Sequence, residues 1–133
     1  MIYSFDTNVC IGYLNGKYPT LLQKLLSIPP SQVTVCSVVR AELFHGAAKS
    51  TNPVKTLATQ QAFLKPYATL PFDDNAAKFY GLERGRLEKL GVTIGPLDLL
   101  IASIALAHNL ILVTNNTREF SRIQGLNLEN WQI

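Results

Sequence analysis

Apolar residues along the chain form short unbroken runs and longer stretches with helical spacing. The runs predict strands at Met1–Phe5, Val33–Cys36 and Leu110–Val113, and weaker strands at Ala68–Pro71 and Leu126–Leu128. Between them, prolines at helix starts and glycine or asparagine at helix ends delimit six predicted helices. The first ends at Leu14, and the others are Pro19–Ile28, Ser37–Lys49, Pro53–Lys65, Asp73 or Asp74 to Gly91, and Pro96–His108.

Strands and helices therefore alternate along the chain. The runs Val33–Cys36 and Leu110–Val113 show no polar alternation, which is typical of strands that helices cover on both faces. We expect an α/β fold with a parallel sheet, formed by residues 1–133 as one domain, because domains of about 100–150 residues are the commonest. Ser37 is expected to cap the helix that follows the second strand.

Polar residues follow the predicted strands at their carboxyl ends, where sites lie in parallel sheets. Asp6 follows the first strand, and Glu42 lies one turn into the helix after the second. Asp98 lies in the first turn of the last predicted helix. Asn116 and Glu119 follow the Leu110–Val113 strand, which comes after this helix. These residues are too far apart in sequence to pair locally, so only the fold can bring them together.

Three of these acids, Asp6, Glu42 and Asp98, have apolar sequence neighbours. A buried carboxylate is costly without a cation, and Arg40 is the only cationic residue close to them in sequence. Converging carboxylates raise one another's pKa values, and a divalent cation removes that cost. All-oxygen ligands favour Mg²⁺ or Mn²⁺ over Zn²⁺, and such a site can activate water for attack on phosphorus.

Charge and hydrophobic content indicate which kinds of partner the protein can bind. The chain carries 12 Lys and Arg against 9 Asp and Glu, a net charge of +3, and its pI is near 9.0. This balance permits a polyanion as partner. Hydrophobic residues make up 47% of the chain, which argues against disorder. Because small domains have much surface for their volume, some apolar surface is expected to meet a protein partner or a second copy.

Nothing in the sequence points to export or to a membrane. The N-terminus has no basic segment followed by a long apolar one, so we expect no signal peptide. No apolar run approaches the roughly 18 residues of a membrane helix. Cys10 and Cys36 lie in apolar stretches and are expected to be reduced, buried thiols of a cytoplasmic protein.

Several motifs occur in an order and spacing typical of one family. They are Phe5-Asp6-Thr7-Asn8, Ser37–Leu43 followed by Gly46-Ala47, Gly95–Ala102, Leu112–Asn116, Arg118-Glu119-Phe120, Gly125-Leu126 and Glu129-Asn130-Trp131. Over essentially the whole chain they resemble the PIN-domain ribonucleases, specifically the VapC toxins of bacterial type II toxin–antitoxin systems. The resemblance implies a PIN-like three-layer α/β/α sandwich with a mainly parallel sheet.

The resemblance also implies the site residues. The family's acidic pocket falls on Asp6, Glu42 and Asp98, and we expect Asp6 and Asp98 to hold Mg²⁺, with Mn²⁺ as the alternative metal. Many members carry a fourth acid after the next strand. Asparagines stand there in this chain, so either Asn116 replaces that acid or Glu119 supplies it.

Five further residues are candidates for supporting roles. Thr7, Asn8 and Thr114 lie beside the acids, and the threonines are placed to hydrogen-bond the carboxylates or the attacking water. Arg40 and Arg118 lie near the same pocket and are candidates for binding the RNA phosphate.

Family members cut tRNA or ribosomal RNA to arrest growth. They are neutralised by a VapB-type antitoxin whose tail occupies the acidic pocket, and they commonly dimerise. The resemblance therefore implies a Mg²⁺-dependent endoribonuclease toxin of the cytoplasm. Its partners would be the RNA, the antitoxin and a second copy, and no membrane is involved.

Two other functions stay open at this point. A catalytically silent PIN module that binds RNA or protein is the first, because asparagines stand at the fourth acidic position. A DNA-directed nuclease is the second.

His45, three residues after Glu42, could form a Glu-x-x-His metal pair, but no second such pair exists and we expect His45 to be structural. His108 is expected to contact the end of a helix.

Overall fold

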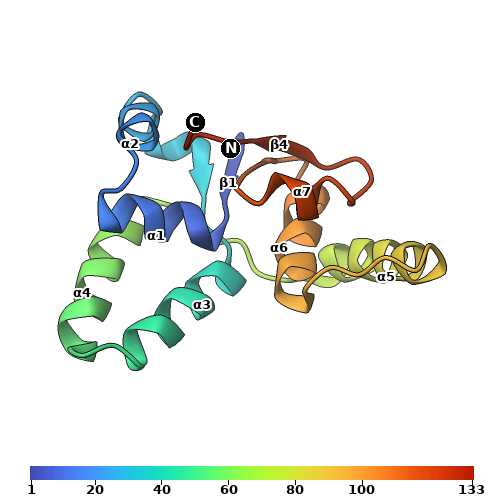
Figure 1. The fold of residues 1–133 in the computed structure, drawn as a ribbon, viewed down its shortest axis with the longest axis horizontal. Helices are drawn as coiled ribbons and strands as arrows, with labels where there is room; N and C mark the ends of the chain where they lie inside the picture. Colours follow the sequence, from blue (N-terminus) through green and yellow to red (C-terminus); the bar gives the residue numbers. More distant parts are fainter.

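The computed structural model describes residues 1–133 as seven α-helices around a four-stranded sheet (Figure 1). The strands are β1 (Tyr3–Phe5), β2 (Val33–Thr34), β3 (Ile111–Val113) and β4 (Asn127–Glu129). The helices are α1 (Thr7–Asn15), α2 (Pro19–Leu26), α3 (Ser37–Ala48), α4 (Pro53–Leu64), α5 (Asp74–Lys89), α6 (Pro96–Ala107) and α7 (Thr117–Phe120), with a 3-10 helix, η1, at Pro30–Gln32. The expected α/β class is confirmed.

All strand pairs are parallel, and the strand order is β2-β1-β3-β4. The chain leaves β1 toward one edge to form β2, and later crosses to the other side of β1 to form β3. The connections thus change direction between β1 and β3, which is the topological switch point of the sheet. Ligands of open α/β sheets bind beyond the carboxyl ends of the strands at such a point. The residues that follow β1 and β3 are therefore the first candidates for function.

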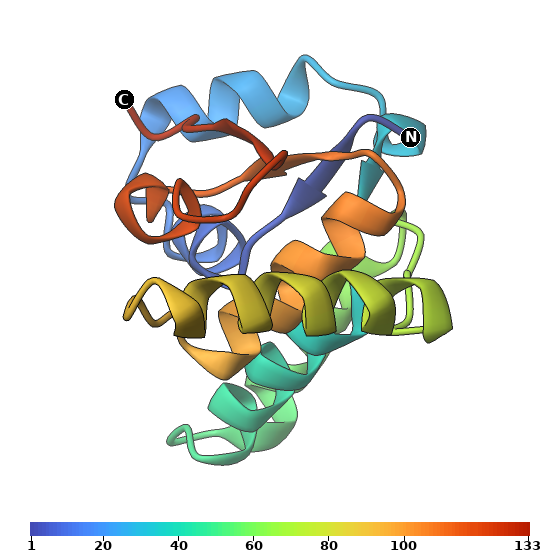
Figure 2. The same ribbon diagram turned by 90° about the vertical axis from the view of Figure 1, so that its right-hand side faces the viewer.

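Helices cover both faces of the sheet. Figure 2 shows α2 on one side of the strands and α5 with α6 on the other. α5 packs along α6, α3 packs against α4, and α1 contacts both α2 and α3. This arrangement confirms the layered sandwich. None of the helices is both long enough and apolar enough to cross a lipid bilayer.

A cluster of 24 buried apolar residues fills the space between the layers. Helix α6 has six buried residues and little polar surface, which explains its place in the interior. β1 and β3 contribute the fully buried side chains Phe5, Leu112 and Val113. Because these side chains anchor the carboxyl ends of β1 and β3, the polar residues that follow have fixed positions.

The structure corrects three local expectations. The segment Ala68–Pro71 is not a strand: only Ala68 forms a bridge, to Thr34, because β2 is two residues long and offers few partners. Ser37 is the first residue of α3 and not its cap, since Cys36 takes the cap position without a side-chain hydrogen bond. The polar segment after β3 contains α7, which at four residues is too short to show helical spacing.

Candidate active site

Asp6 lies at the switch point, directly after β1 and at the start of α1. Its Oδ1 accepts a hydrogen bond from the Thr7 N–H at 2.8 Å, and its Oδ2 accepts one from the Thr114 hydroxyl at 2.8 Å. Asp6 is 3% exposed, and burial raises its pKa although both hydrogen bonds oppose the rise. The negative charges of Glu42 and Glu119 raise it further. The Asp6 carboxylate is thus held rigidly. Its surroundings disfavour its ionised form.

A chain of hydrogen bonds links Asp6 to the residues after β3. The Thr114 hydroxyl donates to Asp6 and accepts from the backbone N–H of Asn116 at 3.0 Å. The Asn116 Nδ2 donates to Oε2 of Glu119 at 3.0 Å, and the Gly95 N–H donates to its Oε1 at 2.9 Å. These two bonds lower the pKa of Glu119, with the Gly95 bond the larger cause. Glu119 contributes the carboxylate here, and Asn116 orients it.

Glu42 reaches the same place from α3. The Thr7 hydroxyl donates to Oε1 of Glu42 at 2.7 Å, while the backbone N–H of Thr7 donates to Asp6. One residue therefore orients two acids and ties α1 to α3. Glu42 itself is partly exposed. Thr7, expected only in a supporting role, positions half of the acids in this site.

Asp98 lies in the first turn of α6 and completes the group. Its pKa is raised from 3.8 to about 6, first by burial and then by the negative charges of Asp6, Glu119 and Glu42. A rise with these causes means that the four carboxylates share one electrostatic environment. The start of α6 favours a negative charge, but this helix dipole does not offset the other effects. We call these four residues the acidic cluster.

No lysine or arginine forms an ion pair with the acidic cluster. The ion pairs of the protein lie on α5, where Arg84 is 4.0 Å from Glu88 and Arg86 is 2.7 Å from Glu83. The chain as a whole has a net charge of +3, so the acidic cluster is a negative site in a basic protein. Arg122 lowers the pKa of Glu119 through its charge without forming an ion pair with it. Carboxylates gathered without a directly paired cation repel one another, which makes the cluster a natural place for a bound cation.

The donors of the acidic cluster fit a hydrated divalent cation. They are all carboxylate oxygens, the ligands that Mg²⁺ and Mn²⁺ prefer. No three histidine, cysteine, aspartate or glutamate side chains are arranged to hold a metal ion directly. Mg²⁺ commonly binds through one or two carboxylates, several waters and a substrate phosphate, so two carboxylates such as Asp6 and Asp98 would suffice as protein ligands. Each Asp6 oxygen keeps lone-pair capacity beyond the hydrogen bond it accepts.

The two arginines expected near the acids have different surroundings. Arg40 donates from Nε to the Val35 carbonyl at 2.9 Å and from Nη2 to the Tyr67 carbonyl at 3.0 Å. Burial lowers its pKa, and its guanidinium ties α3 to the end of β2 and to the turn after α4. Arg118 is exposed on α7, next to Glu119, and forms no ion pair. Arg118 is therefore available to a phosphate, whereas Arg40 is engaged in the structure.

The other polar residues singled out from the sequence lie outside this hydrogen-bond network. Asn8 is exposed on α1, one residue after Thr7. His45 and His108 are exposed on α3 and at the end of α6. The thiols of Cys10 and Cys36 are free and buried, as expected.

Comparison with known proteins relates this site to a family. The family model described as the PIN domain matches residues 3–126, which include the whole acidic cluster. The chain belongs to the PIN-domain family. The resemblance inferred from the sequence motifs is thereby confirmed. In this PIN domain, the acidic cluster lies at the carboxyl ends of β1 and β3.

Relatives that match this PIN domain over nearly their whole length are VapC ribonucleases. It is 40% identical over 133 residues to Ribonuclease VapC2 of Rickettsia felis, with 98% of each chain covered. It is 37% identical over 129 residues to the tRNA(fMet)-specific endonuclease VapC of Shigella flexneri, with 97% of each covered. It is also similar to the crystal structure of VapBC2 from Rickettsia felis bound to a promoter DNA fragment, with a TM-score of 0.91 and 38% identity, covering 98% of this chain and 99% of that one. This PIN domain is thus a nuclease of the VapC type.

The role of Gly95 in this PIN domain was missed from the sequence. Its N–H holds Glu119, and a Cβ at this position would lie 3.6 Å from Oδ2 of Asp98 and 3.8 Å from Oε1 of Glu119. A side chain at residue 95 would therefore border both acids and narrow the access to them. The available signal was a glycine directly before Pro96, which from sequence alone indicates only a helix start.

Proposed function

We propose that the protein cleaves RNA with the help of a divalent cation, Mg²⁺ or Mn²⁺, and acts as the toxin of a toxin–antitoxin pair. The acidic cluster carries this proposal, because four carboxylates meet at the switch point and none of them forms an ion pair with a lysine or arginine. A phosphodiester is itself an anion, so a bound cation would lower the electrostatic cost of bringing it to these acids. The names of the full-length relatives support RNA as the polymer that is cut.

Asp6 and Asp98 are the residues that would hold the cation. When bound, such a cation offsets the charge that develops at phosphorus and activates water for attack. Thr7 and Thr114 fix both oxygens of Asp6, so that carboxylate needs little reorganisation during the reaction. The Thr7 hydroxyl fixes Glu42 in the same way. Water attack in line with the leaving 3′ oxygen breaks one phosphodiester bond and leaves a 5′ phosphate and a 3′ hydroxyl.

The substrate that we infer is a folded RNA with an accessible loop, with tRNA as the first candidate and ribosomal RNA as the second. The relative from Shigella flexneri is specific for tRNA(fMet), and its identity to this chain is 37%. Asp98, Glu42 and Glu119 are partly exposed, so an unpaired strand can reach them from solvent. Both candidate RNAs would place the activity in the cytoplasm.

We infer a VapB-type antitoxin and a second copy of the chain as protein partners. The similar structure from Rickettsia felis is a VapBC2 complex bound to promoter DNA. Several large apolar side chains of this chain are exposed, among them Leu26 at 72%, Val54 at 82%, Leu82 at 72% and Leu90 at 62%. Exposed apolar groups on different helices support contacts with more than one partner surface.

Metal dependence tests the proposed function. The protein, purified free of any partner, is incubated with total RNA or with DNA, in Mg²⁺ or in EDTA. We expect RNA to be cut in Mg²⁺ and to stay intact in EDTA, with the new ends mapped as 5′ phosphate and 3′ hydroxyl. Preferred cleavage of the DNA would instead indicate a DNA-directed nuclease. Cleavage of neither polymer would favour the silent RNA-binding or protein-binding module, which needs no metal.

Arg118→Ala is expected to weaken RNA binding about threefold and to reduce its salt dependence by about one charge. The exposed guanidinium lies beside Glu119 and forms no ion pair, so it is free to contact the RNA backbone. The measurement is RNA affinity as a function of salt concentration. Lys89→Ala, which removes an exposed charge at the end of α5, is the control and should change neither quantity as much. Equal effects of the two variants would contradict a specific role for Arg118.

A further inference from the structure

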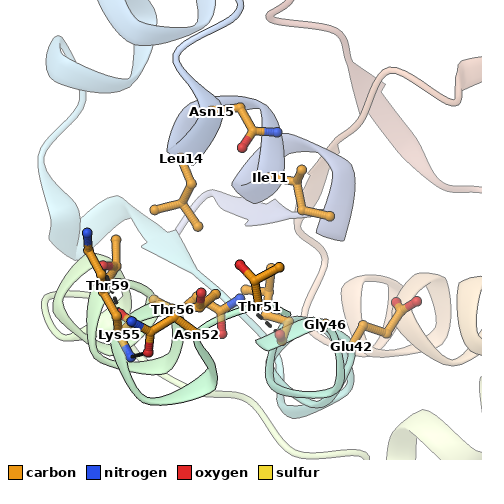
Figure 3. Close-up of a pocket in the computed structure, with 12 residues that line it drawn as sticks. Ile11, Leu14, Asn15, Glu42, Gly46, Thr51, Asn52, Lys55, Thr56 and Thr59 are labelled. Carbon is orange, nitrogen blue, oxygen red and sulfur yellow. Dashed lines mark hydrogen bonds between the residues drawn. The ribbon is translucent and has the colours of Figure 1, made fainter. Parts of the chain in front are cut away.

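A polar cavity adjoins the acidic cluster, between α1, α3 and α4 (Figure 3). Its volume is about 540 Å³, and its lining extends along α3 from Glu42, a member of the acidic cluster, to Gly46. Ile11 and Leu14 of α1 line another side. Residues three or four apart share one face of a helix, so Thr7, Ile11 and Leu14 form one face of α1, as Glu42 and Gly46 do on α3. Both helices therefore lead from the acidic cluster into the cavity.

The lining combines an apolar wall with uncharged polar groups. Figure 3 shows Ile11 and Leu14 facing the segment that joins α3 to α4 and the first turns of α4. That segment contributes Thr51, Asn52, Thr56 and Thr59. The Asn52 Oδ1 accepts from the Lys55 N–H at 3.2 Å, which leaves its amide NH₂ to donate to a ligand. Apolar side chains on one side and hydrogen-bonding groups on another suit a flat ring with polar edges, such as a nucleobase.

Gln60 of α4 supplies an unpartnered acceptor beside this cavity. Its side chain is 7% exposed, and its Nε2 donates to the Leu43 carbonyl at 2.9 Å. Its Oε1 is buried without any hydrogen-bond partner. Gln60 and Leu43 both line the cavity. A buried acceptor without a donor costs free energy, and a small shift of the Gln60 side chain would let an N–H at the edge of a base satisfy it.

Charge and polarity favour RNA over a protein segment as the occupant. Lys55 is the only cation in the lining, and it can contact a phosphate next to the bound base. An apolar protein segment has a better site elsewhere, in the cavity between α1, α2 and α4. That second cavity is lined mainly by apolar residues, including Tyr13, Leu25, Ile28 and Phe63.

We propose that the cavity beside Glu42 holds one unpaired base of the RNA, next to the phosphodiester at the acidic cluster. This inference rests on the proposed function for the identity of the polymer. Asn52, Thr56 and Gln60 are the residues that would select among bases by hydrogen bonding. The cavity thus determines which nucleotide lies beside the bond that is cut.

Gly46→Leu tests the inference by filling the cavity. A Cβ at Gly46 meets no atom within 4 Å, so the added side chain enters open space on α3. Gly85→Leu is the matched control, because Gly85 also lies within a helix, is also partly buried and also has open space at its Cβ, but lies on α5. Both changes replace a helical glycine by a better helix former, so neither should unfold the protein.

The measurement is fluorescence anisotropy in EDTA, with short RNAs of each single base and an abasic RNA of the same length. We expect the wild type and Gly85→Leu to bind RNA of at least one base about tenfold more tightly than abasic RNA. In Gly46→Leu the two affinities should become nearly equal. Equal binding of base-containing and abasic RNA by the wild type would overturn the inference. A base preference that survives in Gly46→Leu would also overturn the inference. This holds even if that variant loses the binding of a protein partner.

Because these titrations use EDTA, they do not require cleavage. Cutting of RNA in Mg²⁺ by the wild type is measured separately. Failure of the cleavage reaction and failure of base selection are therefore distinguishable outcomes.

Discussion

Asp98→Asn is expected to reduce the rate of RNA cleavage by a factor of about a hundred to a thousand. Asp98 would hold the cation together with Asp6, and an asparagine amide is a much weaker ligand for a hard cation than a carboxylate. Asp98 makes no side-chain hydrogen bond to the rest of the chain, so its amide replacement should not disturb the fold. The measurement is the single-turnover rate on purified tRNA in Mg²⁺, with Asp6→Asn as a second variant of the same kind.

Asp74→Asn is the matched control for this experiment. Asp74 is also an acid in the first turn of a helix, but it is exposed on α5 and lies outside the acidic cluster. Its replacement removes one negative charge and should leave the cleavage rate within about twofold of the wild type. Circular dichroism shows whether each variant is folded. Wild-type rates in folded Asp6→Asn and Asp98→Asn would contradict the proposed metal ligands.

Asp98→Asn is also expected to stabilise the protein when metal is removed. In EDTA at about pH 7.5, Asp98→Asn should be about 2 kcal/mol more stable than the wild type, a value discounted because Asp98 is only half-buried. The folded protein raises the pKa of Asp98 from 3.8 to about 6, through burial and the neighbouring carboxylates. Ionising Asp98 therefore costs more free energy in the folded protein than in the unfolded chain. The measurement is the urea midpoint of each variant.

The sign of the pH dependence follows from linkage. A folded-state pKa above the unfolded value means that the folded protein binds the proton more tightly. The contribution of Asp98 to stability is therefore fully present below about pH 4 and is lost as the pH rises through about 6. The advantage of Asp98→Asn should be absent at about pH 4 and grow toward neutrality. An advantage of the same size at both pH values would contradict the electrostatic cause.

Mg²⁺ should reverse the difference in stability between Asp98→Asn and the wild type. A cation that binds only the folded state stabilises it, and the wild type binds the cation more tightly than Asp98→Asn. Saturating Mg²⁺ at neutral pH should therefore raise the urea midpoint of the wild type more than that of the variant. Asp74→Asn again serves as control, since loss of an acid from an exposed helix start is expected to lower stability slightly at neutral pH. An unchanged wild-type midpoint in Mg²⁺ would argue against cation binding at the acidic cluster.

Much of the acidic cluster could be predicted from sequence because position relative to a strand end is a local property. Asp6 and Glu119 follow buried apolar runs, and the parallel sheet brings the ends of those runs to one edge. Asp98 was recognisable as an acid just after a helix-starting proline within an apolar stretch. These inferences needed only the alternation of elements and the rule that parallel strands end together.

The hydrogen bonds within the site could not be predicted in the same way. Thr7 donates to Asp6 through its backbone and to Glu42 through its hydroxyl, and the second bond depends on how α1 packs against α3. Arg40 lies two residues before Glu42, yet its guanidinium bonds the carbonyls of Val35 and Tyr67. Side chains so close in sequence leave a helix in different directions, and only tertiary packing decides what each one meets.

The bond from Thr114 to Asp6 spans 108 residues of sequence. Contacts of such long separation form late, because the intervening chain must first be ordered. During synthesis the amino-terminal part emerges first, so Asp6 leaves the ribosome long before the residues that orient its carboxylate and before Glu119. A nascent chain with β1 and α1 already formed therefore still lacks a complete active site. A cell that makes this nuclease is exposed to its activity only after translation has passed β3 and α7.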